Sequence, residues 1–140
     1  MTTDLSLKVT RTVAAPPERV FDAWLDPATL ARFITPAPDF DTPDVTLDAR
    51  EGGRFDILMK SKDSEIPHWG IYHEIRRPDR LVFSWVSAYS REDSLVTLTF
   101  APDGTGTQVT LVHERFLSEE MRDNHEKGWS AILQHLAEVV

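Results

Sequence analysis

Hydrophobic and polar residues alternate at the start of the chain. The apolar residues of segment 5–14 fall on one parity: Leu5, Leu7, Val9 and Val13. The other parity is mainly polar. An alternation with a period of two predicts a β-strand with one face buried and one face in solvent.

Two short helices are predicted after this strand. Residues 16–25 begin with two prolines, which end the strand and suit a helix start, and apolar residues then recur at helical spacing. Asp26 and the proline after it interrupt this run, and a second helix is expected over residues 28–34. Residues 35–43, TPAPDFDTP, show no periodicity, so they predict an irregular loop that is long enough to act as a lid.

The middle of the chain alternates between short apolar segments and turn-forming segments. Six further strands are expected, over residues 44–49, 54–60, 69–75, 80–86, 94–100 and 107–114. Their links are short, which predicts antiparallel pairing, because a parallel pair needs a long crossover. The inward positions are expected to include Phe55, Ile57, Met59, Leu81, Phe83, Trp85, Val96, Leu98, Phe100, Val109 and Leu111. One face of a single curved sheet is therefore apolar.

Residues 118–138 predict a long amphipathic helix. Ser118 suits the cap position, and the two glutamates after it suit the positive helix start. One side of the helix carries an apolar stripe made of Met121, His125, Trp129, Ile132, Leu133 and Leu136. The apolar face of the sheet is its natural partner. The order of elements predicts an α+β fold in which an antiparallel sheet of six or seven strands wraps around a long C-terminal helix, with two short helices after the first strand.

Gly128 stands inside this last helix, where a glycine costs about 1 kcal/mol relative to alanine. Two interpretations stay open. The missing side chain lets the helix approach the sheet closely, or it leaves open volume beside Trp129 and His125.

Composition narrows the class of protein. The 140 residues are 41% hydrophobic, which fits one domain over residues 1–140. The net charge of −8 disfavours nucleic acid and anionic membrane surfaces as partners. The absence of cysteine excludes disulfides and thiolate chemistry, and it is compatible with a reducing compartment. With neither a signal peptide nor a membrane-spanning apolar run in view, we expect a cytoplasmic protein without membrane insertion.

Several segments resemble one known family. PPERVFDAWLDPATLARF, REGGRF, GIYHEIRRPDRLVFSW, SLVTLTFAPDGTGTQVTLVHERF and HEKGWSAILQHLAE are similar to the homologues of the activator of heat-shock protein 90 ATPase. These proteins belong to the SRPBCC superfamily, together with START lipid-transfer domains and birch-pollen-allergen-like proteins. The resemblance runs from about residue 5 to the C-terminus. It implies a helix-grip fold with an apolar cavity between sheet and helix, whereas activity varies within one fold.

The chain departs from the family pattern in two places. It has Phe33, Ile34, Thr35 and Pro36 where Trp-Trp-Gly-Pro is usual. It also has Arg115 where the family motif HEGF carries glycine. We therefore expect a cavity mouth with a shape of its own.

Aromatic and polar side chains supply the candidate ligand-binding residues. They are Trp24, Phe33, Phe55, Trp69, Tyr72, Phe83, Trp85, His113, His125 and Trp129. The rings are able to line a pocket or simply fill the core. His113 and His125 are suited to orient a ligand or move a proton, with hydrogen-bonded core histidines as the alternative. Tyr72 can reach a ligand only if it faces inward. Ile71 and Ile75, on the other parity of the strand, compete with it for the inward face. Arg11, on the inward parity, either meets a ligand carboxylate or reaches solvent.

No metal site or cofactor is expected. His68 and His73 are five residues apart on one strand and point to opposite faces. APDGTG lacks the ending of a phosphate-binding loop, and the serines lack a matched base and acid.

Three functions remain. The favoured one is binding of a small apolar or aromatic molecule, which calls for a cavity of about 300 Å³ or more. The second is a small-molecule enzyme of cyclase or hydratase type that uses His113, His125 or Tyr72 in the same pocket. The third is a module that stimulates a chaperone ATPase; a chaperone partner is disfavoured because the named co-chaperones carry a further domain. The sequence leaves the ligand and the oligomeric state open, a homodimer included.

Overall fold

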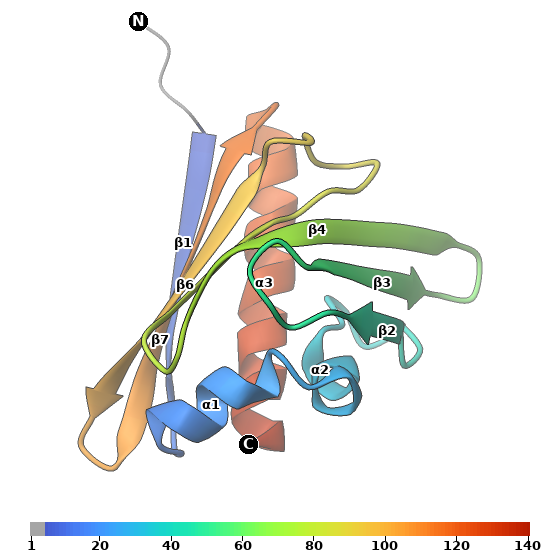
Figure 1. Cartoon of the computed structure of the whole chain (residues 1–140). Coiled ribbons are helices and arrows are strands. Elements are labelled where there is room, and N and C mark those ends of the chain that lie inside the picture. Colours follow the sequence, from blue (N-terminus) through green and yellow to red (C-terminus); the bar gives the residue numbers. More distant parts are fainter. Residues whose placement is uncertain (1–4) are drawn as a thin grey trace, which may run out of the picture.

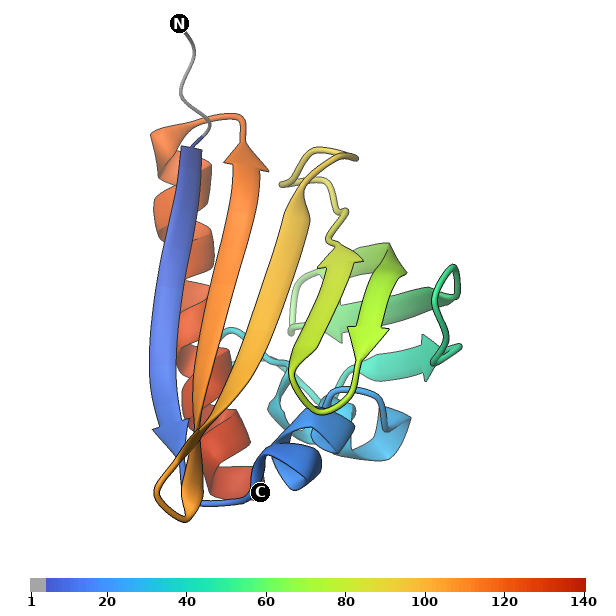
Figure 2. The same cartoon turned by 60° about the vertical axis from the view of Figure 1, so that its left-hand side comes forward.

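Seven strands form one antiparallel sheet in the computed structural model, which describes residues 5–140 (Figures 1 and 2). The spatial order is β1-β7-β6-β5-β4-β3-β2, and every neighbouring pair is antiparallel. The strands are β1 (Leu5–Val13), β2 (Asp44–Leu47), β3 (Arg54–Lys60), β4 (Glu65–Arg76), β5 (Arg80–Ser84), β6 (Leu95–Asp103) and β7 (Gly106–Phe116). The two edge strands are β1, which precedes the two short helices in the sequence, and β2, which follows them.

Three helices complete the fold. They are α1 (Pro17–Ala23), α2 (Pro27–Phe33) and α3 (Glu119–Val139). The long helix α3 lies along the inner face of the sheet, behind β1 and β7 in the view of Figure 2. Helices α1 and α2 lie at one end of the sheet, near the C-terminal end of α3 (Figure 1). The helix-grip architecture expected from the sequence is confirmed.

Local signals in the sequence account for the helix starts. The side chain of Ser118 accepts a hydrogen bond of 3.2 Å from the backbone N–H of Met121 and so caps α3. Asp26 caps α2 by accepting from the N–H of Thr29, with a proline at the first helical position. Asp26, which was expected to interrupt the first helix, is therefore the N-cap of the second. Helix α2 begins at Pro27, one position earlier than predicted.

The inward positions predicted for the central strands are all buried. The buried side of α3, made of Trp129, Ile132, Leu133 and Leu136, belongs to the same apolar cluster, as do buried residues of α1 and α2. This cluster of apolar side chains is the core of the fold.

Strand β4 is longer than predicted, because it begins at Glu65 and includes Pro67. A proline has no N–H to donate, but Pro67 pairs only with Leu58 of β3, and β5 does not extend alongside it. Further along β4, Gly70 lets the strand approach β5 closely. A Cβ at that position would collide with the Ser84 carbonyl and with the Phe55 ring.

No helix within residues 5–140 combines the length and the apolar character that a membrane crossing requires.

Candidate functional site

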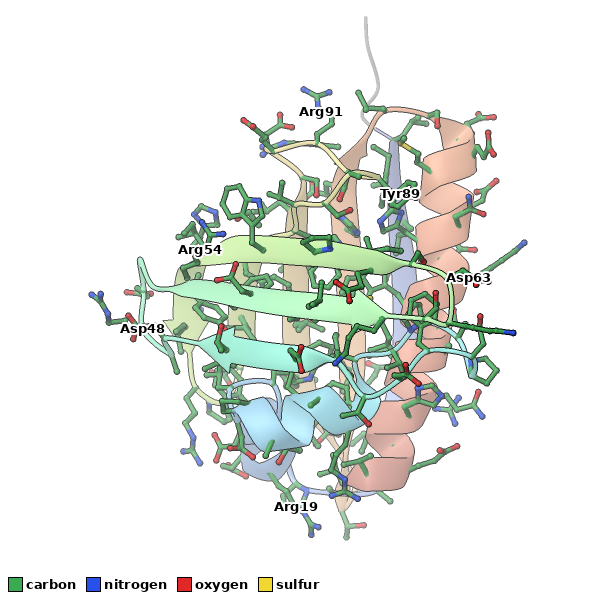
Figure 3. The ribbon with its side chains drawn as sticks, turned by 90° about the vertical axis from the view of Figure 1, so that its right-hand side faces the viewer. Arg19, Asp48, Arg54, Asp63, Tyr89 and Arg91 are labelled. Atoms are coloured by element: carbon green, nitrogen blue, oxygen red, sulfur yellow. The ribbon has the colours of Figure 1, made fainter. Side chains whose placement is uncertain are left out.

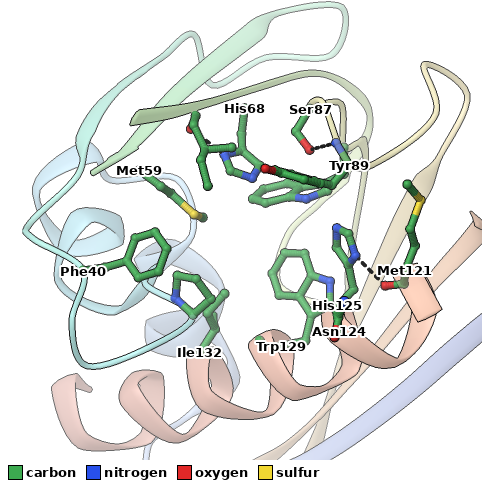
Figure 4. Close-up of a pocket in the computed structure, with 14 residues that line it drawn as sticks. Phe40, Met59, His68, Ser87, Tyr89, Met121, Asn124, His125, Trp129 and Ile132 are labelled. Atoms are coloured by element: carbon green, nitrogen blue, oxygen red, sulfur yellow. Dashed lines mark hydrogen bonds between the residues drawn. The ribbon is translucent and has the colours of Figure 1, made fainter. Parts of the chain in front are cut away.

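A cavity of about 200 Å³ lies between the inner face of the sheet and the first half of α3 (Figure 4). Its walls come from β3, β4, α3, the loop 35–43 and the segment after β5. The lining residues are Pro36, Phe40, Met59, Ile66, His68, Trp85, Ser87, Tyr89, Met121, Asn124, His125, Gly128, Trp129 and Ile132. Most of this surface is apolar or aromatic. The cavity is smaller than the 300 Å³ or so expected for a drug-sized ligand.

Trp85 and Trp129 form one corner of the cavity. Their ring centroids are 4.8 Å apart, and the ring planes meet at 58°. Both side chains are buried, at 3% and 2% exposure. The two rings come from the sheet and from α3, so their contact also fixes the distance between the two layers.

A buried polar chain holds these two rings in place. The indole Nε1–H of Trp129 donates to Nδ1 of His113 at 3.0 Å. Because Nδ1 accepts, the neutral ring carries its proton on Nε2, which lies 3.0 Å from Oγ of Ser94. Ser94 in turn donates to the backbone carbonyl of Trp85 at 2.5 Å. Burial lowers the pKa of His113 to about 2, so the ring stays neutral.

The polar contacts of His113 are therefore made to the protein itself. It is fully buried behind Trp129 and does not line the cavity. Of the two interpretations that the sequence left open, the hydrogen-bonded core histidine describes its surroundings.

Two other histidines line the cavity. Nδ1 of His125 lies 2.8 Å from the carbonyl oxygen of Met121, one turn earlier in α3. Nδ1 of His68 lies 3.0 Å from the carbonyl oxygen of Ile66 in β4. A carbonyl only accepts, so each Nδ1 carries the proton. Burial lowers the pKa of His68 to about 4 and also lowers the pKa of His125. Both rings are therefore neutral near pH 7.

The loop 35–43 covers part of the cavity. Phe40 forms an isolated bridge with Ser61, and the N–H of Asp41 donates to the carbonyl of Lys60 at 2.7 Å. These backbone contacts attach the loop to the end of β3. Pro36 and Phe40 then contribute side chains to the wall, and Phe40 is labelled there in Figure 4.

Gly128 faces this loop and the cavity. A Cβ built on Gly128 would meet only Cβ of Pro36, at 3.2 Å. The sheet is not within 4 Å of that position. Close packing of helix against sheet is therefore not the reason for this glycine.

A second cavity of about 20 Å³ lies between the sheet and the α1–α2 region, and Trp85 lines both cavities. Phe55, Tyr72, Phe83 and Trp24 line it together with Trp85. Nε1 of Trp24 is buried there without a hydrogen-bond partner among the described residues. This volume is close to the minimum that holds one water molecule. Five of the ten predicted binding residues, Trp85 among them, thus line a space that is too small for an organic ligand.

Trp69 was expected in the cavity but lies on the outer face of the sheet. The guanidinium carbon of Arg54 stands 4.6 Å from the centre of its ring, and Figure 3 looks onto this outer side, where Arg54 is labelled. The even-numbered positions His68, Gly70 and Tyr72 are the buried ones, so Trp69 points the other way. Phe33 is buried against Trp24, at a centroid distance of 5.0 Å, and lines neither cavity.

Of the ten predicted residues, Trp85, His125 and Trp129 meet at the larger cavity. Tyr72 does face inward, and Arg11 reaches solvent. Lining residues that were not among the predicted binding residues include His68, Pro36, Phe40, Ser87, Tyr89 and Asn124. His68 had a usable signal, because it shares the parity of Tyr72. The loop residues had none.

The described residues around the larger cavity include no Asp, Glu, Lys or Arg. Within residues 5–140, no three histidine or carboxylate side chains are grouped in a way that would hold a metal ion. The chemistry that this surface offers is apolar contact and a few neutral hydrogen bonds.

Solved structures share this architecture. CV1439 from Chromobacterium violaceum is 28% identical with a TM-score of 0.86, and the match covers 97% of each chain. Mll3558 from Rhizobium loti is 26% identical with a TM-score of 0.82, over 99% of this chain and 98% of that one. The AHSA1-like protein from Aeromonas hydrophila is 25% identical with a TM-score of 0.79, over 96% and 92%.

No protein of curated function matches the chain. The family model described as Activator of Hsp90 ATPase homolog 1-like protein matches residues 14–140, which include strands β2 to β7, all three helices and every residue that lines the larger cavity. The chain belongs to this family.

Proposed function

We propose that the protein binds a small apolar or aromatic molecule in the cavity between the sheet and α3. The observation that carries this proposal is the cavity itself, about 200 Å³ in volume and walled by Trp85, Trp129 and Met59. An apolar cavity of about 150 Å³ in another protein accommodates benzene. The size therefore favours a ligand with one ring and a small substituent.

Catalysis by the residues that the sequence singled out is less well supported. His125 lines the larger cavity, Tyr72 lines the smaller one, and His113 lines neither. An acid–base enzyme needs such groups to converge on one reacting atom. Burial also lowers the pKa of His113 to about 2 and raises that of Tyr72, which removes both from proton transfer near neutral pH.

Docking to a chaperone is also disfavoured. A protein partner needs an apolar or strongly charged contact surface. Among the described residues, the large apolar side chains with high exposure are Tyr89 and Leu117. The apolar lining of the larger cavity faces the space between the sheet and α3 instead.

Toluene is a suitable probe for this proposal. We expect saturable binding to the wild-type protein by calorimetry. Gly128→Leu places a side chain at the cavity wall and should weaken binding at least tenfold. Ser130→Leu adds the same side chain at an exposed position of the same helix and should bind as the wild type does. Failure of the wild type to bind any one-ring probe, or equal binding by both variants, would count against the proposal.

A further inference from the structure

We infer that the ligand is a neutral molecule whose ring carries a hydroxyl or N–H group, and that this group donates its hydrogen bond to one of two imidazoles, that of His125 or that of His68. This inference rests on the proposed function and narrows it to a chemical class. It follows from the protonation and position of two imidazoles and from the absence of charge around them.

His125 presents an acceptor to the cavity. Its Nδ1–H is held by the carbonyl of Met121 at 2.8 Å, inside its own helix. The lone pair of the neutral ring is therefore on Nε2. Because the residue lines the cavity and its other nitrogen is engaged by the backbone, Nε2 is the ring atom available to a ligand.

His68 repeats this arrangement on the facing wall. Its Nδ1–H is directed to the carbonyl of Ile66 at 3.0 Å, within its own strand. Its ring packs against Trp85 with centroids 4.9 Å apart and the ring planes tilted by 41°, a contact that restricts its orientation. Figure 4 shows the two imidazoles projecting from β4 and from α3 on opposite sides of the cavity.

The charge of the ligand follows from the same surroundings. Burying a carboxylate or an ammonium group is costly unless an opposite charge pairs with it. None of the described residues around the cavity supplies such a charge. A neutral hydroxyl or N–H donor avoids this cost and also satisfies an acceptor that a purely apolar ligand leaves without a partner.

Phenol and toluene separate the hydrogen bond from the apolar contact, because the two molecules have nearly the same shape and only phenol carries a hydrogen-bond donor. We expect phenol to lose about fivefold in affinity, relative to toluene, when His125 is changed to Phe, which is the net value of one neutral hydrogen bond. His68→Phe should shift the ratio in the same direction. Benzoate should not compete with toluene for the wild-type protein at pH 7.5.

The chain offers a matched control for each histidine. His135 lies on α3 and His73 on β4, and neither lines the cavity. His135→Phe and His73→Phe should leave the phenol-to-toluene ratio unchanged. Toluene binding by each variant reports that the fold and the cavity are intact.

Three outcomes would overturn the inference. An unchanged ratio in both His125→Phe and His68→Phe, with toluene still bound, removes the hydrogen bond but leaves the proposed function standing. Competition by benzoate contradicts the requirement for a neutral ligand. Failure of both toluene and phenol to bind the wild type overturns the proposed function together with the inference.

Discussion

The indole N–H of Trp129 donates to Nδ1 of His113 at 3.0 Å, and this hydrogen bond joins α3 to β7 inside the core. The same imidazole continues through Ser94 to the backbone of Trp85. The two aromatic walls of the cavity are thus held by one satisfied polar chain. A tryptophan whose N–H is already satisfied presents an apolar face to a ligand.

Removing this imidazole should destabilise the protein. In His113→Phe the Trp129 N–H loses its acceptor while it stays buried, which costs about 1 to 3 kcal/mol. We expect the free energy of unfolding in urea to fall by that amount. His73→Phe, at an exposed position of β4, should change it by less than about 0.5 kcal/mol. Equal effects of the two substitutions would show that the polar chain contributes no specific stability.

Stability should fall on mild acidification. Burial lowers the pKa of His68 to about 4 and that of His113 to about 2, while the unfolded chain titrates near 6.5. Between these values the unfolded state binds more protons, so the free energy of unfolding decreases as the pH drops below 6.5. From pH 7 to pH 5 the loss should be about 2 kcal/mol for each ring.

Urea unfolding at the two pH values measures this effect. His68→Phe should show a pH-dependent loss smaller by about 2 kcal/mol, because one titrating group is gone. Stability that is equal or higher at pH 5 would contradict the burial of neutral histidines.

Gly128→Ala should stabilise the free protein by up to about 1 kcal/mol through better helix propensity. The new methyl meets only Cβ of Pro36 at 3.2 Å, and Pro36 lies on a loop, which yields more easily than a strand. The same methyl takes up cavity volume, so toluene affinity should fall.

Gly70→Ala provides the contrast. A Cβ there would collide with the backbone of Ser84, so this substitution should cost about 1 to 3 kcal/mol or more. Denaturant unfolding of both variants checks the pair. A clear loss of stability in Gly128→Ala would mean that the Pro36 segment is as rigid as the sheet.

The hydrophobic periodicity of the segments and the order of the elements along the chain predicted most of the fold. The alternation of strand residues and the stripe on α3 identify the buried faces, because one side of each element must leave water. The pattern did not locate the start of β4, since Pro67 is a poor strand residue that is accepted where only one neighbouring strand pairs.

The site was less accessible to sequence reasoning. Trp85 and Trp129 follow from parity, but Trp69 was misplaced because it is the first residue of the predicted strand, where no preceding strand residue indicates which face is buried. Phe40 and Tyr89 come from irregular segments, where no period relates a residue to a face. A cavity is formed by the meeting of such segments with regular elements, and only the folded chain shows that meeting.

The four indole N–H signals in a proton–nitrogen NMR spectrum test the central claim most directly, because the four tryptophans report on three different places. Trp85 and Trp129 line the larger cavity, Trp24 lines only the smaller one, and Trp69 stacks under Arg54 on the outer face. On titration with toluene, we expect the signals of Trp85 and Trp129 to shift together and to saturate, while the Trp69 signal stays in place. Shifts that do not saturate, or that are largest at Trp69, would contradict a ligand site between the sheet and α3.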